Sequence, residues 1–296
     1  MFVLVALPLA AQTAKPRNGV FSDVKYCTGG GQPLLMDVFI PKHPIRKPTP
    51  AVLWIHGGGW ERGDKNENSP ALALAHEGFV TASVNYRLSG EAPFPADIHD
   101  CKCAIRFLRA NAARFGIDPE RIGVAGASAG GHLAELVAAA GPAAELEGTG
   151  GWPGVSSRVQ AAASWYGVSD FTVGAMQFEH HTGKVVVKLF RGTEDEHPEL
   201  YRQASPIFYV SKDGPPLFLA HGEKDDLVPF DQSVRMAEAW RKAGLQVEFI
   251  PVKNAGHGFQ QIGFAPVSPS VGTINKRTIA FFKRNLAGTA QGPPKP

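Results

Sequence analysis

Alternating strand-like and helix-like segments predict an α/β fold built on one doubly wound, mostly parallel sheet. The first observation is a set of short, continuously apolar runs, such as Ala51–Ile55 and Leu217–Ala220, which are typical of strands buried on both faces. The second is that helix-like runs alternate with these strands as far as Leu286. The third is a pair of strand-like runs before Pro41 with no helix between them, which predicts an antiparallel edge.

The composition indicates a folded chain and excludes several classes of protein. Of 296 residues, 44% are hydrophobic and 19% are charged, which allows a sizeable core and excludes a disordered chain. The net charge of +3, without a clustered basic stripe, gives no reason to expect a nucleic-acid partner. No apolar run reaches the roughly 18 residues of a membrane-spanning helix. The oligomeric state cannot be derived from these features.

The two ends of the chain are expected to lie outside the folded unit. Met1–Gln12 is an apolar run followed by small residues, which is typical of a signal peptide, although a basic n-region is missing. We expect a leader over residues 1–14, a single domain over 15–287 and a disordered tail over 288–296. The leader predicts a secreted or periplasmic protein.

Three cysteines leave at least one thiol unpaired in a monomer, so the chain is not a disulfide scaffold. Cys101 and Cys103 fall on one expected helix, where side chains two positions apart diverge. A bridge from Cys27 to either of them is compatible with the sequence. The adjacent His180 and His181 have no carboxylate at ligand spacing, so no metal is expected.

The individual elements follow from apolar periodicity and from proline and glycine. Strands are expected at 20–26, 34–40, 51–55, 79–86, 121–127, 159–166, 217–220 and 247–252. Helices are expected at 95–115, from 132 onward, at 230–243 and at 271–286, and another begins at Ser69 as N-cap with Pro70 at the first helical position. The stretch Asp170–Ser205 is polar without clear periodicity, and we expect it to be irregular.

Gly126–Gly130 places a serine between a strand-like run and a helix-like run, in the pattern G-x-S-x-G. The small residues around Ser128 would let two backbones approach closely, and glycine tolerates unusual backbone angles. Taken alone, the pattern also fits an ordinary tight turn. A serine is a poor nucleophile at neutral pH and needs a neighbouring base, which a third group must orient.

Two later loops carry residues of the types that such a serine needs. The segment His221–Pro229 reads HGEKDDLVP, and Asn254–Phe259 reads NAGHGF; each follows an expected strand. Because catalytic groups of open α/β sheets gather at the carboxyl ends of the strands, both loops should converge on Ser128. A third loop, His56–Trp60, reads HGGGW and also follows a buried strand.

These motifs are specific when taken in order. HGGGW, NYRL at Asn85–Leu88, GASAGG at Gly126–Gly131, HGxxDxxVP and GHGF fall between about residues 34 and 286. The chain resembles the α/β-hydrolase-fold serine esterases, near the hormone-sensitive-lipase-like branch and the bacterial feruloyl and acetyl-xylan esterase (BD-FAE-like) branch. The resemblance implies an α/β-hydrolase fold with a short lid insertion at about 170–205, and ester hydrolysis without a cofactor.

The resemblance also implies roles for single residues. Ser128 matches the nucleophile, His257 the general base, and Asp225 the carboxylate that orients the imidazole. Asp226 is the alternative for the last role.

By the same resemblance, the backbone N–H groups of Gly58, Gly59 and Ala129 form an oxyanion hole. Trp60 either lines the pocket or anchors the oxyanion loop. Further apolar groups of the pocket would come from the lid region and the strand before it. These candidates are Trp165, Phe171, Phe178 and Phe190.

The remaining histidines are expected to have structural roles. His56 and His221 belong to their motifs but are expected to brace loops. His99 and His132 lie on expected helices, where they would be packed or solvated.

A short lid and an export leader favour short-chain or aryl esters, including acetyl or feruloyl groups on plant polysaccharides. An arylformamidase-like amide hydrolase has a similar oxyanion loop and stays an alternative, as does a lipase, although no broad apolar lid pattern is seen. A prolyl-oligopeptidase-type peptidase is disfavoured, because the propeller domain of that family is absent from this sequence.

A non-catalytic binding module is also disfavoured, because such a module would usually have lost a triad member and none is missing here. Glu223 and Asp225 do not form a glycosidase pair, because no second acidic motif accompanies them.

Overall fold

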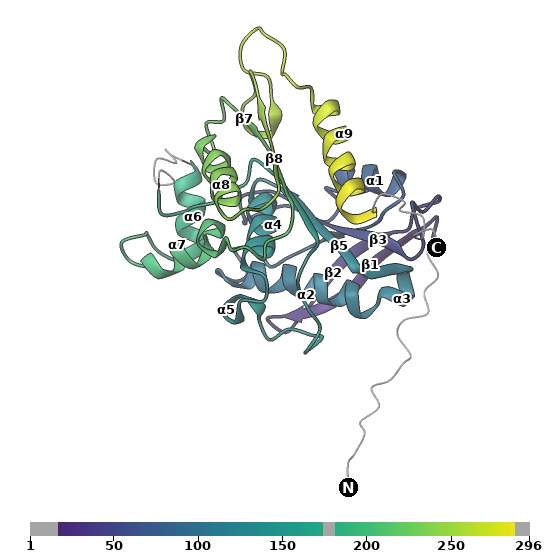
Figure 1. The fold of residues 1–296 in the computed structure, drawn as a ribbon. Helices are drawn as coiled ribbons and strands as arrows, with labels where there is room; N and C mark the ends of the chain where they lie inside the picture. The colour runs from purple at the N-terminus through teal and green to yellow at the C-terminus, as the bar shows by residue number, and fades with distance from the viewer. Residues whose placement is uncertain (1–16, 174–180, 288–296) are drawn as a thin grey trace.

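The computed structural model describes residues 17–173 and 181–287 of the chain. Its centre is an eight-stranded sheet with the strand order β1-β2-β4-β3-β5-β6-β7-β8. Helices cover both faces of this sheet (Figure 1). The expected leader over 1–14, the tail over 288–296, and Phe178 and His180 lie outside the described residues.

The sheet is mostly parallel, with an antiparallel edge, as the sequence predicts. β1 and β2 form a hairpin and β2 pairs antiparallel with β4, whereas β3 to β8 pair parallel with one another. The strands are β1 (Val20–Gly29), β2 (Gln32–Phe39), β3 (Thr49–Ile55), β4 (Val80–Val84), β5 (Ile117–Ala127), β6 (Ala161–Trp165), β7 (Leu217–Gly222) and β8 (Val247–Val252).

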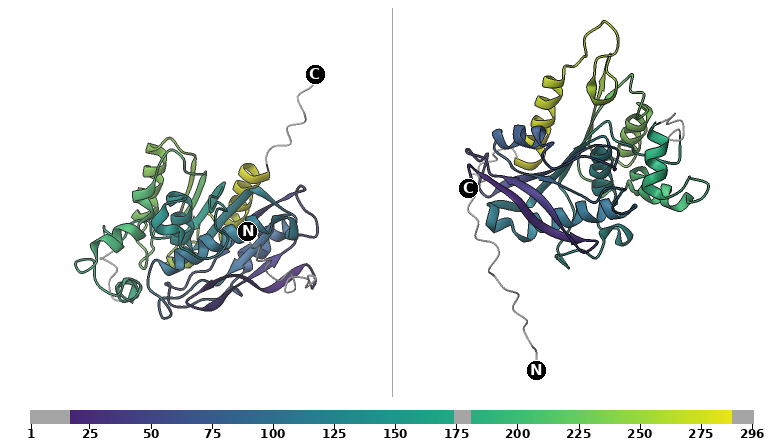
Figure 2. Two further views of the ribbon diagram at one scale, coloured as in Figure 1. Left: turned by 90° about the horizontal axis from the view of Figure 1, so that it is seen from below. Right: turned by 180° about the vertical axis from the view of Figure 1, so that it is seen from behind.

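The helices form two layers, one on each face of the sheet (Figure 2). They are α1 (Ser69–His76), α2 (Ala96–Ala110), α3 (Ala112–Phe115), α4 (Ala129–Ala140), α5 (Ala144–Glu147), α6 (His181–Phe190), α7 (Pro198–Ala204), α8 (Asp231–Lys242) and α9 (Val271–Phe282). Helices α2, α4 and α8 pack into one apolar cluster, and α1 and α9 into the other. None of the helices in the described ranges is both long and apolar enough to cross a bilayer.

The two cores explain why β3 is apolar throughout. Leu53 and Ile55 belong to the cluster with α2 and α4, whereas Val52 and Trp54 belong to the cluster with α1 and α9. Successive side chains of a strand point to opposite faces, so a central strand covered on both faces needs apolar residues at every position.

The start of α1 differs from the sequence expectation. Ser69 was expected as the N-cap, but the N-cap is Asn68, and its side chain makes no capping hydrogen bond. Pro70 is therefore the second residue of the helix rather than the first, but it is still in the first turn, where its missing N–H costs no helical bond.

The stretch 170–205 also differs, because it contains α6 and α7 rather than irregular structure alone. Helix α6 buries Val185, Val186, Leu189 and Phe190. This spacing is that of an amphipathic helix, with the four side chains on one face. Only one such face is apolar and the helix is short, so the polar residues around it concealed the periodicity.

A disulfide joins Cys27 of β1 to Cys103 of α2, and Cys101 is a buried free thiol. The expected divergence of Cys101 and Cys103 on one helix is confirmed. The bridge ties the antiparallel edge of the sheet to the helix layer that also covers β5.

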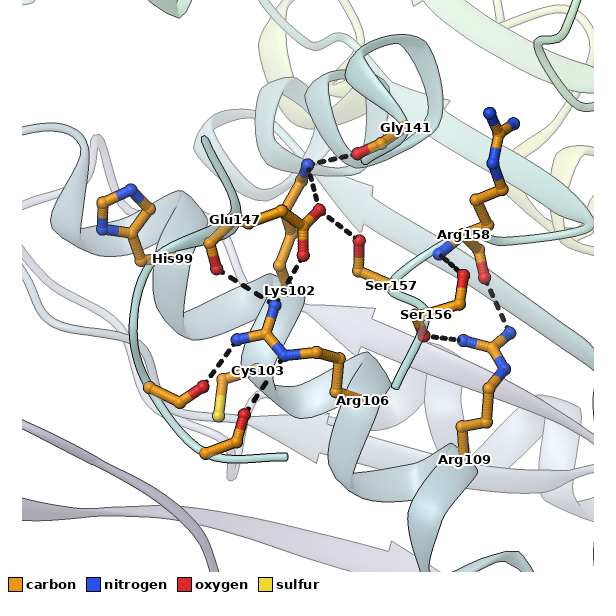
Figure 3. Close-up of polar contacts among 12 residues, drawn as sticks. His99, Lys102, Cys103, Arg106, Arg109, Gly141, Glu147, Ser156, Ser157 and Arg158 are labelled. Atoms are coloured by element: carbon orange, nitrogen blue, oxygen red, sulfur yellow. Dashed lines mark hydrogen bonds and ion pairs between the residues drawn. The ribbon is translucent and has the colours of Figure 1, made fainter. Parts of the chain in front are cut away.

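An ionic cluster holds the segment after α4 against helix α2 (Figure 3). Glu147 lies 2.9 Å from Lys102 Nζ and 2.8 Å from Arg106 Nη1, and the Lys102 side chain is fully buried. Arg106 also donates to the carbonyl of Gly150 at 2.7 Å. Because each charge has a partner, the cluster avoids the high cost of an isolated buried ion.

We predict that loss of the disulfide lowers the free energy of unfolding by about 2–4 kcal/mol, because the bridge restrains a long loop of the unfolded chain. Cys103→Ala should show this loss in urea unfolding, and a reductant should then have no further effect. In the control Cys101→Ala, the reductant should still destabilise the protein. Equal stability of oxidised wild type and Cys103→Ala would contradict the prediction.

Candidate active site

The chain turns sharply between β5 and α4 at Ser128, whose φ is 56° and ψ −121°. A positive φ is uncommon outside glycine and marks a strained position. A Cβ on Gly126 would lie 2.2 Å from the carbonyl oxygen of Gly130, and a Cβ on Gly130 would lie 2.1 Å from that of Ile55. Both glycines are therefore required by the close approach of α4 to β5 and β3.

Three side chains from different loops meet at this turn. Ser128 Oγ lies 2.9 Å from Nε2 of His257, and Nδ1 of His257 lies 2.8 Å from Oδ2 of Asp225. An ionised carboxylate can only accept a hydrogen bond, so the His257 proton is on Nδ1 and Nε2 is left to accept from the serine hydroxyl. Asp226 is exposed, and Asp225 is the carboxylate in contact with the histidine.

The Asp225 carboxylate is buried and surrounded by donors. Its Oδ1 accepts the backbone N–H groups of Leu227 at 3.0 Å and Val228 at 2.9 Å, and its Oδ2 lies 3.3 Å from Nε2 of His221. Burial opposes ionisation, but the hydrogen bonds from His221 and His257 outweigh it and hold the pKa of Asp225 well below its usual value. The group therefore carries a negative charge beside His257.

Two further histidines brace loops, as expected from the sequence. His56 places Nδ1 2.7 Å from the Gly57 carbonyl and stacks on Tyr86 with ring centroids 4.5 Å apart. Burial lowers the pKa of His56, which favours its neutral form. His221 is fully buried, with Nδ1 2.7 Å from Ser233 Oγ.

The glycine loop after β3 lies directly over the turn at Ser128. A Cβ on Gly57 would lie 2.9 Å from the Ala127 carbonyl oxygen. Gly58 and Gly59 have φ of 102° and 63°, a conformation that favours glycine. Among the hydrogen bonds of the described residues, none is donated by the backbone N–H of Gly58, Gly59 or Ala129. Gly58 and Gly59, together with Ser128, also line a cavity.

A cavity of about 330 Å³ opens beside Ser128 and His257. Trp60, Tyr166 and Val185 contribute apolar walls. The rest of the lining outside the glycine loop includes Trp54, Glu61, Arg62, Glu67, Leu227, Val228 and Gly258. Over residues 17–173 and 181–287, no group of three or more His, Cys, Asp or Glu side chains is arranged to hold a metal ion.

Two residues that line the cavity, Tyr166 and Val185, lie outside the sequence motifs and could not be predicted from them. Tyr166 directly follows β6, and its ring centroid lies 4.7 Å from that of His257. Its place at the carboxyl end of a buried strand is the signal that could have identified it. Val185 belongs to α6, and a Cβ on Gly59 would lie 3.1 Å from its Cγ1, so this helix closes over the glycine loop.

Three expected pocket residues do not line this cavity. Trp165 packs against Trp54 at 5.4 Å in the cluster with α9, and its indole donates to a threonine of that helix. Phe171 is fully buried behind Trp60, with ring centroids 5.6 Å apart, and Phe190 packs behind Phe171 at 5.2 Å. These rings support the wall rather than forming it. Trp60 lines the cavity. Its side chain is also buried, with 3% exposed, so the residue both forms the wall and packs into the core behind it.

The fold and the order of these motifs define the chain as an α/β-hydrolase-fold protein. The sequence model of the BD-FAE family matches residues 36–240. The chain therefore belongs to the BD-FAE family.

Relatives and solved structures are consistent with this assignment. The chain is 34% identical over 276 residues to Esterase LipQ of Mycobacterium tuberculosis, an alignment that covers 90% of this chain and 65% of LipQ. A truncated carbohydrate esterase from gut microbiota superposes with a TM-score of 0.77 at 27% identity, covering 92% of this chain and 99% of the other. Propionate-bound Est2 of Thermogutta terrifontis gives 0.74 at 25% identity, covering 93% and 97%.

We predict that Asp225→Asn lowers kcat for a p-nitrophenyl ester by about 10⁴-fold with little change in KM, because an amide can hold His257 in the wrong tautomer. Asp226→Asn is the matched control and should stay within about twofold of wild type. Steady-state kinetics on the two variants measure this. A larger loss in Asp226→Asn would reverse the assignment.

Proposed function

We propose that the protein is a serine carboxylesterase in which Ser128 is the nucleophile, His257 the general base and Asp225 its orienting carboxylate. The observation that carries this proposal is the pair of hydrogen bonds, 2.9 Å and 2.8 Å long, that runs from Ser128 Oγ through His257 to a buried, ionised Asp225. A serine activated in this way attacks acyl groups.

Acylation begins when Ser128 Oγ attacks the ester carbonyl carbon while Nε2 of His257 takes the hydroxyl proton. The carbonyl oxygen becomes an oxyanion, which the N–H groups of Gly58, Gly59 and Ala129 stabilise as its charge develops. The tetrahedral intermediate then collapses, and the protonated His257 gives its proton to the departing alcohol. A water molecule repeats the sequence on the acyl-enzyme and releases the carboxylic acid.

The substrates proposed are short-chain or aryl esters, including acetyl or feruloyl groups on plant polysaccharides. A cavity of about 330 Å³ is near the lower end of the range for small-molecule sites, which disfavours long acyl chains. Trp60, Tyr166 and Val185 offer apolar contacts suited to a small acyl or aryl group. The propionate bound to Est2 and the likeness to a carbohydrate esterase from gut microbiota support the same choice.

We also propose that the protein is exported and that residues 15–287 form a single domain. The Cys27–Cys103 disulfide supports export, because such bonds persist in oxidising compartments and are rare in reducing ones. The single sheet shared by all strands of the described ranges supports one domain.

Ser128→Ala is predicted to lower the turnover of p-nitrophenyl acetate by at least about 10⁴-fold, because the acyl-enzyme is proposed to form on the hydroxyl that this variant removes. A fluorophosphonate probe should label wild type and the exposed-serine control Ser211→Ala, but not Ser128→Ala. Mass spectrometry of the labelled peptide measures this. Undiminished labelling of Ser128→Ala would refute the nucleophile assignment.

A panel of p-nitrophenyl esters of rising acyl length, with methyl ferulate, acetylated xylan and N-formylkynurenine, tests the substrate class. We expect kcat/KM to be highest for two to four acyl carbons and to fall steeply beyond about eight, because the cavity is small. Preference for long acyl chains would identify a lipase. Preference for N-formylkynurenine would identify an arylformamidase-like amide hydrolase.

A further inference from the structure

The glycine loop over Ser128 has a backbone that must be held in place. Gly58, Gly59 and Trp60 are three successive residues with positive φ, and the φ of 57° at Trp60 is unfavourable for a residue with a side chain. Such a conformation persists only where its surroundings fix it. Backbone bonds hold part of the loop, because the Gly58 carbonyl accepts from Arg62 at 3.2 Å and the Trp60 carbonyl accepts from Ser89 at 2.6 Å. The contacts of the Trp60 side chain add a further restraint on this loop, which carries the N–H groups of Gly58 and Gly59.

The Trp60 indole is bound to a buried histidine on the helix that follows the nucleophile. Trp60 Nε1 donates to Nδ1 of His132 at 3.1 Å, and Nε2 of His132 donates to the Ala204 carbonyl at 2.7 Å. His132 is fully buried. Its backbone N–H also donates to the Ser128 carbonyl at 2.9 Å. One residue thus contacts the backbone of Ser128, the anchor of the glycine loop and the end of α7.

The two side-chain bonds permit a single protonation state of His132. An indole N–H can only donate and a carbonyl oxygen can only accept, so Nδ1 must be unprotonated and Nε2 must carry the hydrogen. A second proton on Nδ1 would face the Trp60 N–H and break the bond. Burial lowers the pKa of His132 to about 4, which keeps the ring neutral under ordinary conditions.

Ring packing alone does not fix the indole in this way. Trp60 meets His132 edge to face at 5.4 Å, and Phe171 packs against both rings. Apolar contacts of this kind exclude water but depend weakly on direction. The hydrogen bond to Nδ1 is directional, and it sets the rotation of the indole and of the backbone attached to it.

We propose that His132 is a positioning residue for the oxyanion loop, which it holds in register with Ser128 by accepting the Trp60 indole N–H while it is anchored to Ala204. This inference rests on the proposed esterase function, because the loop is assumed to bind the oxyanion. Its effect is expected in the transition state, where the distance from N–H groups to the oxyanion matters most.

The test compares variants on p-nitrophenyl acetate. His132→Leu removes both side-chain bonds and should lower kcat by about 10–100-fold with KM within about twofold, as expected for a misplaced catalytic group. His132→Asn keeps an acceptor close to the Nδ1 position and should recover most of this loss. Trp60→Phe should lower kcat to a similar extent, and Trp60→Phe combined with His132→Leu should cause little further loss, because both remove the same bond.

The control for structural damage is Tyr201→Phe, which removes a different buried hydrogen bond of α7, from the tyrosine hydroxyl to Gly192 at 3.1 Å. It should lower the unfolding midpoint and leave kcat unchanged. The inference is overturned if His132→Leu keeps wild-type kcat, if His132→Asn is no better than His132→Leu, or if Tyr201→Phe loses kcat to the same degree. Retained turnover in Ser128→Ala would instead overturn the proposed function.

Discussion

The close approach of α4 to the end of β3 is the constraint on which the site depends. No side chain fits at Gly130, where a Cβ would lie 2.1 Å from the Ile55 carbonyl oxygen. This contact forces the sharp turn at Ser128 and brings the loop after β3 over it. Because β3 and β5 are neighbours in the sheet, the glycine loop and the serine start from adjacent strand ends. The geometry of the site is thus set by the strand order and by the glycine at position 130, which lets α4 contact the end of β3.

The charge of the Asp225 carboxylate is the second determinant of the site. A buried carboxylate would ordinarily favour its neutral form, yet Asp225 is surrounded by two backbone N–H groups and two histidines. The resulting negative charge fixes the proton of His257 on Nδ1. The cost of burying the charge is offset by these donors, and His221, with Nε2 3.3 Å from the carboxylate, is one of them.

The sequence was sufficient for the fold class and for the residues that meet at Ser128. Strand ends at one edge of a parallel sheet must lie together, so loops bearing Asp225 and His257 could be assigned to the site without a structure. The choice between Asp225 and Asp226 needed the family pattern, because adjacent residues of a loop have no periodicity to separate them.

The walls of the cavity could not be assigned in this way. Val185 reaches the cavity only because α6 packs against the glycine loop. Trp60 and Phe171 are packed against each other, and only the tertiary packing determines that Trp60 faces the cavity and Phe171 lies behind it. The pairing of Cys27 with Cys103 likewise follows from how β1 lies against α2, and three cysteines alone allow either partner.

A crystal structure of the protein inhibited by a phosphonate ester would show directly which atoms bind the reacting group. We expect a covalent bond from Ser128 Oγ to phosphorus, with the phosphoryl oxygen within hydrogen-bond distance of the N–H groups of Gly58 or Gly59 and of Ala129. The Trp60 indole should stay bonded to His132. An adduct on another residue, or a phosphoryl oxygen turned away from the glycine loop, would contradict it.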